Sequence, residues 1–155
     1  MNVRRIESRD LDKVLEIYYK IDSKAPFSTL EGWALSEVRE QLSGFIDSSN
    51  YVSLCSEDDS ELTAFVFCRI ASARLATIEI FCKNPNCDPA RNGGLAGSQW
   101  ELVFAELLNE LKSRGIQSVN TLVNKRFHNF RMHTKFLEFG GFTKISELVE
   151  YEIDL

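Results

Sequence analysis

The sequence has few of the features that mark a membrane, secreted or metal-binding protein. Its 155 residues contain no run of about eighteen apolar residues, so a membrane-spanning helix is not expected. The N-terminal stretch, Met1 to Ile6, contains two arginines and lacks the apolar core of a signal peptide. No CxxC pair is present, and this removes a common metal-binding and redox motif. We therefore expect a cytoplasmic protein without a metal cofactor.

The chain has four cysteines and only three prolines. Cys55, Cys68 and Cys82 lie in strand-like runs, and Cys87 lies in a loop. Because buried cysteine behaves as a small apolar residue and cytoplasmic disulfides are rare, we expect reduced, buried thiols. Three prolines interrupt the chain, and no internal repeat, linker or low-complexity segment is visible. With 44% hydrophobic residues, the chain is expected to form a single domain over 1–155.

Positive charge is in deficit. The formal net charge is −5 and the isoelectric point is near 5.1. Such a balance argues against nucleic-acid binding through bulk electrostatics, so neither a nucleic acid nor a membrane is expected as a partner. It favours, weakly, a substrate that is itself cationic.

Apolar periodicity and turn residues predict an α/β protein. Helical spacing of apolar residues predicts helices over 8–21, 28–46, 95–114 and 129–139. Apolar runs bounded by turn residues predict strands over 3–6, 51–56, 62–70, 74–83 and 116–123. One or two closing strands are expected within 142–155. The order βααβββαβαβ predicts a mixed central sheet with helices on both faces.

Capping and turn residues predict where two helices and one hairpin turn begin. Ser8 is the expected N-cap of the first helix, and Ser28 with Glu31 forms a capping-box pattern that opens the second. The polar residues 57–60 predict the turn of a hairpin. The nearly continuous apolar run 63–68 predicts a central strand that is covered on both faces.

A glycine-rich stretch directly before the third expected helix carries the strongest functional signal. Residues 91–97 read Arg-Asn-Gly-Gly-Leu-Ala-Gly. Bare loop amides and a helix N-terminus both favour an anion. The spacing excludes a P-loop, since no lysine follows the glycines, and it does not match the GxGxxG dinucleotide fingerprint. The stretch predicts an anion-binding loop, and the alternative is a glycine-rich turn without a ligand.

The same stretch resembles a known family signature. Residues 91–96 resemble the Arg/Gln-x-x-Gly-x-Gly/Ala signature of the GCN5-related N-acetyltransferase (GNAT) superfamily. The order of expected elements resembles that family over nearly the whole chain, and Gly140-Gly141-Phe142 resembles its Gly-Phe ending. The resemblance implies a GNAT-like fold. It also implies an acetyl-CoA-dependent N-acetyltransferase that acts on a primary amine by direct attack in a ternary complex.

The resemblance also implies which residues hold acetyl-CoA. The signature amides would bind its pyrophosphate, and the preceding strand would offer its backbone to the pantetheine arm. Strands 74–83 and 116–123 would splay apart to admit it. Asn129 is preferred over Asn124 as the asparagine that contacts CoA. The implied set is Ile80, Phe81, Cys82, Arg91, Asn92, Gly93, Gly94, Leu95, Ala96, Gly97, Ser98 and Asn129.

Catalytic residues are assigned partly from the residues and partly from the resemblance. Glu79 is the expected general base, directly or through water, because burial in an apolar strand raises the pKa of a carboxyl group. The alternative is a solvated or structurally paired carboxylate. Leu137 occupies the position of the family's usual tyrosine acid. His133, one helical turn earlier, is expected to replace it, with Tyr51 and Tyr151 as further candidates.

Several questions stay open at the level of sequence. Acceptor contacts are expected from 27–33, the hairpin and the tail, and the acceptor is a small amine, an amino-acid derivative or a protein terminus. A homodimer is also left open. The replacement of tyrosine by Leu137 favours an alternative, a catalytically silent acyl-CoA-binding module, and a plain α/β domain without CoA is a third reading.

A basic cluster near the C-terminus has two readings as well. Six potentially basic residues occupy eleven positions of an acidic chain: Lys125, Arg126, His128, Arg131, His133 and Lys135. They form either a solvated helix face or a patch for the 3′-phosphate of CoA or an acidic partner.

Overall fold

The computed structural model contains five strands and three α-helices in the part of the chain that it describes. The described residues are 2–21, 33–84, 86–87, 96–123, 134–135, 137–138, 140–147 and 153–154. The elements are β1 (Asn2–Arg5), η1 (Ser8–Asp10), α1 (Leu11–Ile21), α2 (Leu35–Asp47), β2 (Tyr51–Asp58), β3 (Glu61–Ile70), β4 (Leu75–Lys83), α3 (Ala96–Ser113) and β5 (Ser118–Thr121). This order confirms the expected one as far as β5. No helix among the described residues is both long and apolar enough to cross a membrane.

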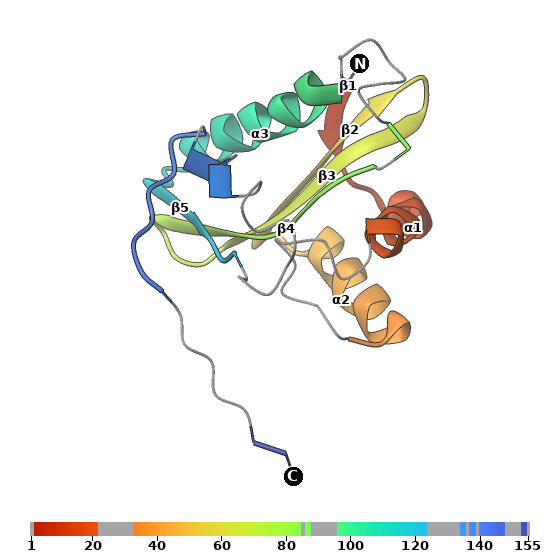
Figure 1. Cartoon of the computed structure of the whole chain (residues 1–155), viewed down its shortest axis with the longest axis horizontal. Helices are drawn as coiled ribbons and strands as arrows, with labels where there is room; N and C mark the ends of the chain where they lie inside the picture. The colour runs from red at the N-terminus through yellow and green to blue at the C-terminus, as the bar shows by residue number, and fades with distance from the viewer. Residues whose placement is uncertain are drawn as a thin grey trace.

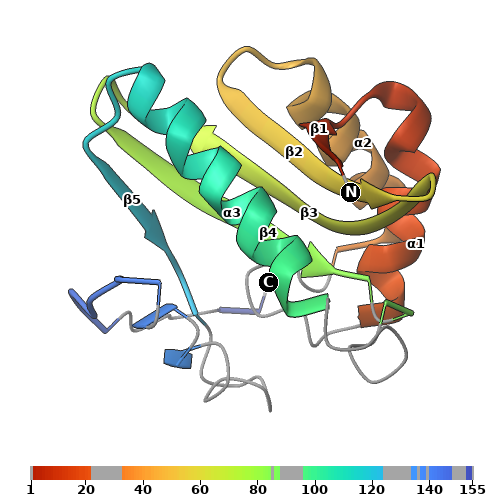
Figure 2. The same ribbon diagram turned by 90° about the horizontal axis from the view of Figure 1, so that it is seen from above.

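The strands form one mixed sheet in the order β1-β2-β3-β4-β5. Neighbours from β1 to β4 are antiparallel, whereas β4 and β5 are parallel. Helix α3 crosses one face of the sheet, and α1 and α2 cover the other (Figures 1 and 2). The mixed sheet with helices on both faces is therefore confirmed, and α3 supplies the crossover that a parallel β4–β5 pair requires.

Strand β3 lies at the centre of two hydrophobic clusters, one on each face of the sheet. Phe65 and Phe67 belong to the cluster under α1 and α2, which we call the α1/α2-side core. Val66 and Cys68 belong to the cluster under α3, which we call the α3-side core. All four side chains are fully buried. The expected central strand with both faces covered is confirmed, and its unbroken apolar run follows from this double burial.

The β2–β3 hairpin closes through a two-residue turn. Asp59 and Ser60 have positive φ angles, 47° and 66°. Two consecutive left-handed residues are typical of the type I′ turn, whose twist matches that of the flanking strands. The turn is shorter than the expected 57–60, because Glu57 and Asp58 pair with β3 and belong to β2.

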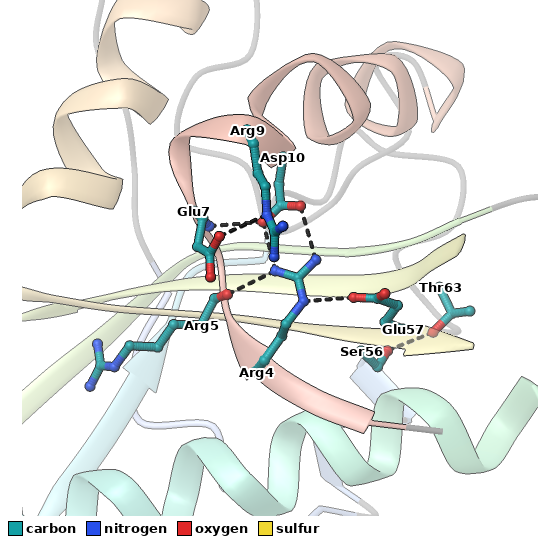
Figure 3. Close-up of polar contacts among 8 residues, drawn as sticks. All are labelled: Arg4, Arg5, Glu7, Arg9, Asp10, Ser56, Glu57 and Thr63. Atoms are coloured by element: carbon teal, nitrogen blue, oxygen red, sulfur yellow. Dashed lines mark hydrogen bonds and ion pairs between the residues drawn. The ribbon is translucent and has the colours of Figure 1, made fainter. Parts of the chain in front are cut away.

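A polar cluster fastens β1 to β2 and to η1 (Figure 3). Arg4 donates to both carboxylate oxygens of Asp10, at 2.7 and 2.9 Å, and its Nε donates to Glu57 at 2.6 Å. Asp10 also accepts from the backbone N–H of Glu7 at 2.8 Å, which makes Glu7 the N-cap. The expected N-cap Ser8 is therefore wrong. The hydrogen bonds from Arg4 hold the pKa of the Asp10 carboxyl below its ordinary value.

Helix α2 begins later than the sequence predicts. Trp33 and Ala34 are described and are not helical, so the first helical residue is Leu35. The N–H of Ala34 is satisfied by the Glu37 carboxylate at 2.9 Å. The expected unbroken helix over 28–46 is therefore wrong at Trp33 and Ala34, and the Ser28–Glu31 pattern lies outside the described residues.

The C-terminal end of α3 has the geometry expected for a glycine stop. Gly115 has a φ of +80°, and its N–H donates to the carbonyl of Lys112 at 3.0 Å. The N–H of Ile116 donates to the carbonyl of Leu111, also at 3.0 Å. These two bonds form a Schellman motif, which satisfies carbonyls that the helix would otherwise leave unpaired.

The region after β5 is described only in short pieces. Residues 134–135 and 137–138 are helical, which agrees with the expected helix over 129–139. Residues 142–147 and 153–154, within the expected closing strands, are not in a strand. The rest of the tail lies outside the described residues.

Candidate active site

Strands β4 and β5 pair along only part of their length. Their pairing runs from Leu75–Ser118 to Ile78–Thr121, where β5 ends. Strand β4 continues for five more residues, to Lys83. Among the described residues, the edge of β4 that faces β5 has no strand partner beyond Ile78 (Figure 2). The resemblance implied that these two strands splay apart, and the described residues show that their pairing stops at this point.

Side chains hold the last pairs before the strands diverge. The Thr121 hydroxyl donates to the carbonyl of Ile78 at 3.1 Å. One position earlier on each strand, the Thr77 hydroxyl donates to the amide oxygen of Asn120 at 2.7 Å. Both bonds join β4 directly to β5. The point of divergence is thus fixed by side chains as well as by the backbone ladder.

A β-bulge lies immediately beyond this point. Phe67 of β3 pairs with Ile80, and the next residue, Cys68, pairs with Ile78, so Glu79 faces no residue of β3. Ile78 belongs to the α3-side core and Ile80 to the α1/α2-side core. Regular alternation would put both on one face, and the bulge is what separates them. Bulges that redirect a side chain in this way are frequent next to active sites.

The carboxylate of Glu79 is paired at both oxygens. The Tyr51 hydroxyl donates to Oε2 at 2.9 Å, and Arg69 Nε donates to Oε1 at 2.6 Å. The Glu79 side chain is only 12% exposed. The carboxylate is therefore paired within the protein, and the pairing brings together residues of β2, β3 and β4.

Tyr51 is held in place beside Glu79 by ring stacking and by its hydrogen bond. Its ring stacks on Phe45 with a centroid separation of 4.1 Å and an interplanar angle of 12°. Burial raises the pKa of the Tyr51 hydroxyl, and the hydrogen bond to Glu79 raises it further. The phenol therefore stays protonated and donates to the carboxylate.

Arg69 was not identified from the sequence. It lies directly opposite Tyr51 in the β2–β3 pairing. Its hydrogen bond to Glu79 raises the pKa of the guanidinium, so this group is permanently cationic. Only the register of β2 on β3 brings it to Glu79, and no motif in the sequence encodes that register.

Asn84 is a second residue that the sequence did not single out. It follows β4 directly and is fully buried. Its side chain donates to the carbonyl of Leu62 at 2.8 Å and accepts from the N–H of Asn86 at 3.0 Å. Its own N–H donates to the carbonyl of Thr63 at 2.8 Å. Asn84 thus fixes the direction in which the chain leaves the sheet toward the glycine-rich stretch.

The described part of that stretch begins helix α3. Ala96, Gly97 and Ser98 are its first three residues. Figures 1 and 2 both show the beginning of α3 at the same end of the sheet as the C-terminal end of β4. The first N–H groups of a helix lack intrahelical partners and attract anions. The other expected loop residues, 91–95, lie outside the described residues, as do Asn129, His133 and Tyr151.

Leu137 lies against the α3-side core and carries no proton to donate. The chain then turns at Gly141, whose φ is +89°. The N–H of Gly141 donates to the backbone carbonyl of Glu138 at 3.0 Å. The N–H of Phe142 donates to the backbone carbonyl of Leu137 at 2.9 Å. The ring of Phe142 packs on that of Phe104 in α3, with the ring centroids 5.9 Å apart. The Gly-Phe ending is therefore a second Schellman motif that docks this segment on α3.

The four cysteines are free and buried, as expected. Burial raises the pKa of Cys55 and of Cys68 to about 12. It raises the pKa of Cys82 and of Cys87 as well. All four are therefore protonated thiols near neutral pH and poor nucleophiles. Within the described ranges, no group of three or more metal-ligating side chains comes together.

Solved structures with the same fold include several acetyltransferases. No family model and no curated protein matches the chain. An aminoglycoside antibiotic 6′-N-acetyltransferase from Acinetobacter haemolyticus matches with a TM-score of 0.71 and 13% identity, over 100% of this chain and 99% of that one. An aminoglycoside acetyltransferase in complex with CoA-S-monomethyl-acetylneamine gives a TM-score of 0.70 and 12% identity, over 99% and 98%.

A more distant match acts on a protein. The ribosomal-protein-S18-alanine N-acetyltransferase from Escherichia coli gives a TM-score of 0.57 and 14% identity, over 87% of this chain and 75% of that one. At such identities the likeness is one of fold. The chain has the fold of the GNAT acetyltransferases.

Proposed function

We propose that the chain is an acetyl-CoA-dependent N-acetyltransferase that acts on a primary amine. The observation that carries this proposal is the edge of β4 over 79–83, which has no strand partner among the described residues and lies at the same end of the sheet as the first turn of α3. A peptide-like pantetheine arm can add to an open strand edge, and a diphosphate is favoured at a helix N-terminus. The fold neighbour in complex with a bisubstrate analogue of CoA and neamine supports the assignment.

The binding residues follow from this arrangement. The side chains of Ile80, Phe81 and Cys82 are buried in the two cores, so these residues would offer only their backbone to the pantetheine arm. The amides of Ala96, Gly97 and Ser98 would hold the pyrophosphate. The loop residues Arg91, Asn92, Gly93, Gly94 and Leu95, together with Asn129, complete the proposed set.

Glu79 is the proposed general base. Its carboxylate lies one residue beyond the last β4–β5 pair, where β4 opens. There it would accept the proton of the acceptor ammonium, directly or through water, which leaves a nucleophilic amine. Tyr51 would keep the carboxylate in position, and a backbone N–H at Phe81 or Cys82 would stabilise the developing oxyanion.

The proposed machinery also needs a proton donor for the departing CoA thiolate. Leu137 cannot donate, and the Tyr51 hydroxyl is already bound to Glu79. His133 keeps the proposed role of general acid. The position of Leu137 favours a second candidate function, an acyl-CoA-binding module that does not transfer the acetyl group.

One experiment separates these functions. The purified full chain is melted with and without CoA, and release of CoA thiol from acetyl-CoA is followed with a panel of amines. An enzyme shows a raised melting temperature and amine-dependent thiol release. A silent binding module shows the first without the second. If neither occurs with CoA at millimolar concentration, both functions are excluded.

The acceptor is proposed to be a small-molecule amine. Aminoglycoside acetyltransferases are among the fold neighbours over the full chain, whereas the protein-directed neighbour matches less of it. The panel should therefore include aminoglycosides, polyamines and a peptide with N-terminal alanine. A cytoplasmic location is part of the proposal, and the four reduced cysteines support it.

A further inference from the structure

The two partners of Glu79 differ in how firmly they are held. Tyr51 is partly buried and stacked on Phe45. The Arg69 side chain is 44% exposed, whereas that of Glu79 is 12% exposed. Glu79 is the only ion-pair partner of Arg69 among the described residues. Arg69 is therefore the more exposed of the two partners of Glu79.

We propose that Arg69 is an internal cation that the ammonium group of the acceptor displaces from Glu79. This inference rests on the proposed function, since it concerns how the acceptor reaches the proposed base. It makes Arg69 a determinant of affinity for cationic acceptors, and it makes Tyr51 the partner that holds Glu79 during the exchange.

Tyr51 and Arg69 bind different oxygen atoms of the Glu79 carboxylate, so one can leave while the other stays bound. Tyr51 binds Oε2 and Arg69 binds Oε1. Departure of Arg69 therefore frees one oxygen and leaves the other anchored. Because the Glu79 side chain is mostly buried, water solvates its carboxylate poorly once Arg69 has left. An incoming ammonium then pairs with a negative charge that would otherwise have no partner.

The exposure of Arg69 makes the exchange feasible. Because the guanidinium is partly exposed in the pair, water can solvate it when it leaves Glu79. Replacing one cation by another also leaves the charge of the site unchanged. A neutral acceptor offers no such replacement and would leave the Arg69–Glu79 pair intact. The site thus selects cationic amines over neutral ones, in keeping with the acidic chain.

The test compares Arg69→Gln with two controls. Arg69→Lys keeps a competing cation at the same place. Arg5→Gln removes another exposed arginine of the sheet that pairs with a single carboxylate, that of Glu110. Each variant is saturated with CoA and titrated calorimetrically with spermidine and with neamine. KM and kcat for the same amines are measured with acetyl-CoA.

Displacement predicts that Arg69→Gln binds the amines about fivefold more tightly and lowers their KM, that Arg69→Lys changes both less than Arg69→Gln does, and that Arg5→Gln behaves as the wild type does. A purely structural Arg69 predicts a lower kcat with unchanged or weaker amine binding, and that result would overturn the inference. If the wild type does not bind CoA, the proposed function itself fails, and the inference fails with it. Binding of CoA with unaltered amine affinity in Arg69→Gln contradicts the inference alone.

Discussion

The hydroxyl of Thr121 donates to the carbonyl oxygen of Ile78 at 3.1 Å, at the last pair that joins β4 and β5. The bond is made by a side chain at the residue where β5 ends. It satisfies a carbonyl of β4 that would otherwise lie beside the gap between the strands. This hydroxyl therefore helps to hold the boundary between the paired and the open part of β4, together with the Thr77–Asn120 bond and the backbone pairing.

Replacing this hydroxyl tests its contribution. Thr121→Val keeps the shape of the side chain and removes the donor, so the free energy of unfolding should fall by about 1 kcal/mol. Thr121→Ser retains the hydroxyl and serves as the control. Urea unfolding measures both variants. Equal stability of Thr121→Val and the wild type would show that the bond does not hold the strands together.

The role proposed for Glu79 predicts a separation of binding from catalysis. Glu79→Gln keeps an acceptor for Tyr51 but cannot take a proton, so kcat should fall by roughly 10²- to 10⁴-fold while the Kd for CoA stays the same. Glu106→Gln, which changes an exposed carboxylate on α3, is the matched control. Unchanged turnover by Glu79→Gln would exclude this residue as the base.

The Arg4–Asp10 pair predicts a pH-dependent contribution to stability. The pKa of Asp10 is lowered in the folded chain, chiefly by its hydrogen bonds to Arg4. Its contribution is therefore complete above the unfolded pKa of about 4 and is lost as the pH falls through the lower folded pKa. Asp10→Asn should cost about 3 kcal/mol near neutral pH, and the difference from the wild type should shrink in acid.

The control for this prediction lies two residues further along. Asp12 also pairs with an arginine, Arg39, but its side chain is 84% exposed. Asp12→Asn should change the free energy of unfolding by less than about 1 kcal/mol. Urea unfolding across a pH series measures both variants. A constant difference between Asp10→Asn and the wild type down to about pH 2 would contradict the assigned pairing.

Two glycines should respond in opposite directions to the same substitution. Gly115 has a φ of +80°, and no atom lies within 4 Å of an added Cβ, so Gly115→Ala should be destabilising by about 1 kcal/mol through backbone strain alone. Gly44 lies inside α2, where an added Cβ also meets nothing within 4 Å. Gly44→Ala should stabilise by about 0.5–1 kcal/mol. Thermal melting checks the signs, and equal signs would contradict the account.

The sheet was largely predictable because its strands carry strong local signals. The expected 62–70 and 74–83 differ from β3 and β4 by one residue at one end. Double burial of β3 is visible in the sequence as an apolar run, and the hairpin is visible as a polar break. The helix ends before Gly115 and Gly141 were predictable for a similar reason, since left-handed caps demand glycine.

The helix starts were less predictable. Ser8 and Ser28 are good caps by composition, yet Glu7 caps η1 and α2 begins only at Leu35. Polar residues that can cap are common in loops, and tertiary contacts choose among them. At η1 the deciding contact is that of Asp10 with Arg4, a residue of β1.

Of the residues that pair at the candidate site, only Glu79 was predictable from the sequence. Glu79 stands out in the sequence as a charge within an apolar strand. Its partners do not, because Tyr51 and Arg69 reach it only through the pairing register of β2, β3 and β4 and through the bulge at Glu79 itself. Register is set by the packing of whole strands, and a single sequence does not display it.

The central claim is that this chain transfers an acetyl group to an amine. The most direct measurement incubates the full chain with acetyl-CoA and the amine panel and detects the acetylated amine by mass spectrometry, beside reactions that contain Glu79→Gln or no protein. The account predicts an N-acetylated product with the wild type and far less with the variant. Binding of CoA without any acetylated product, over the whole panel, would contradict it.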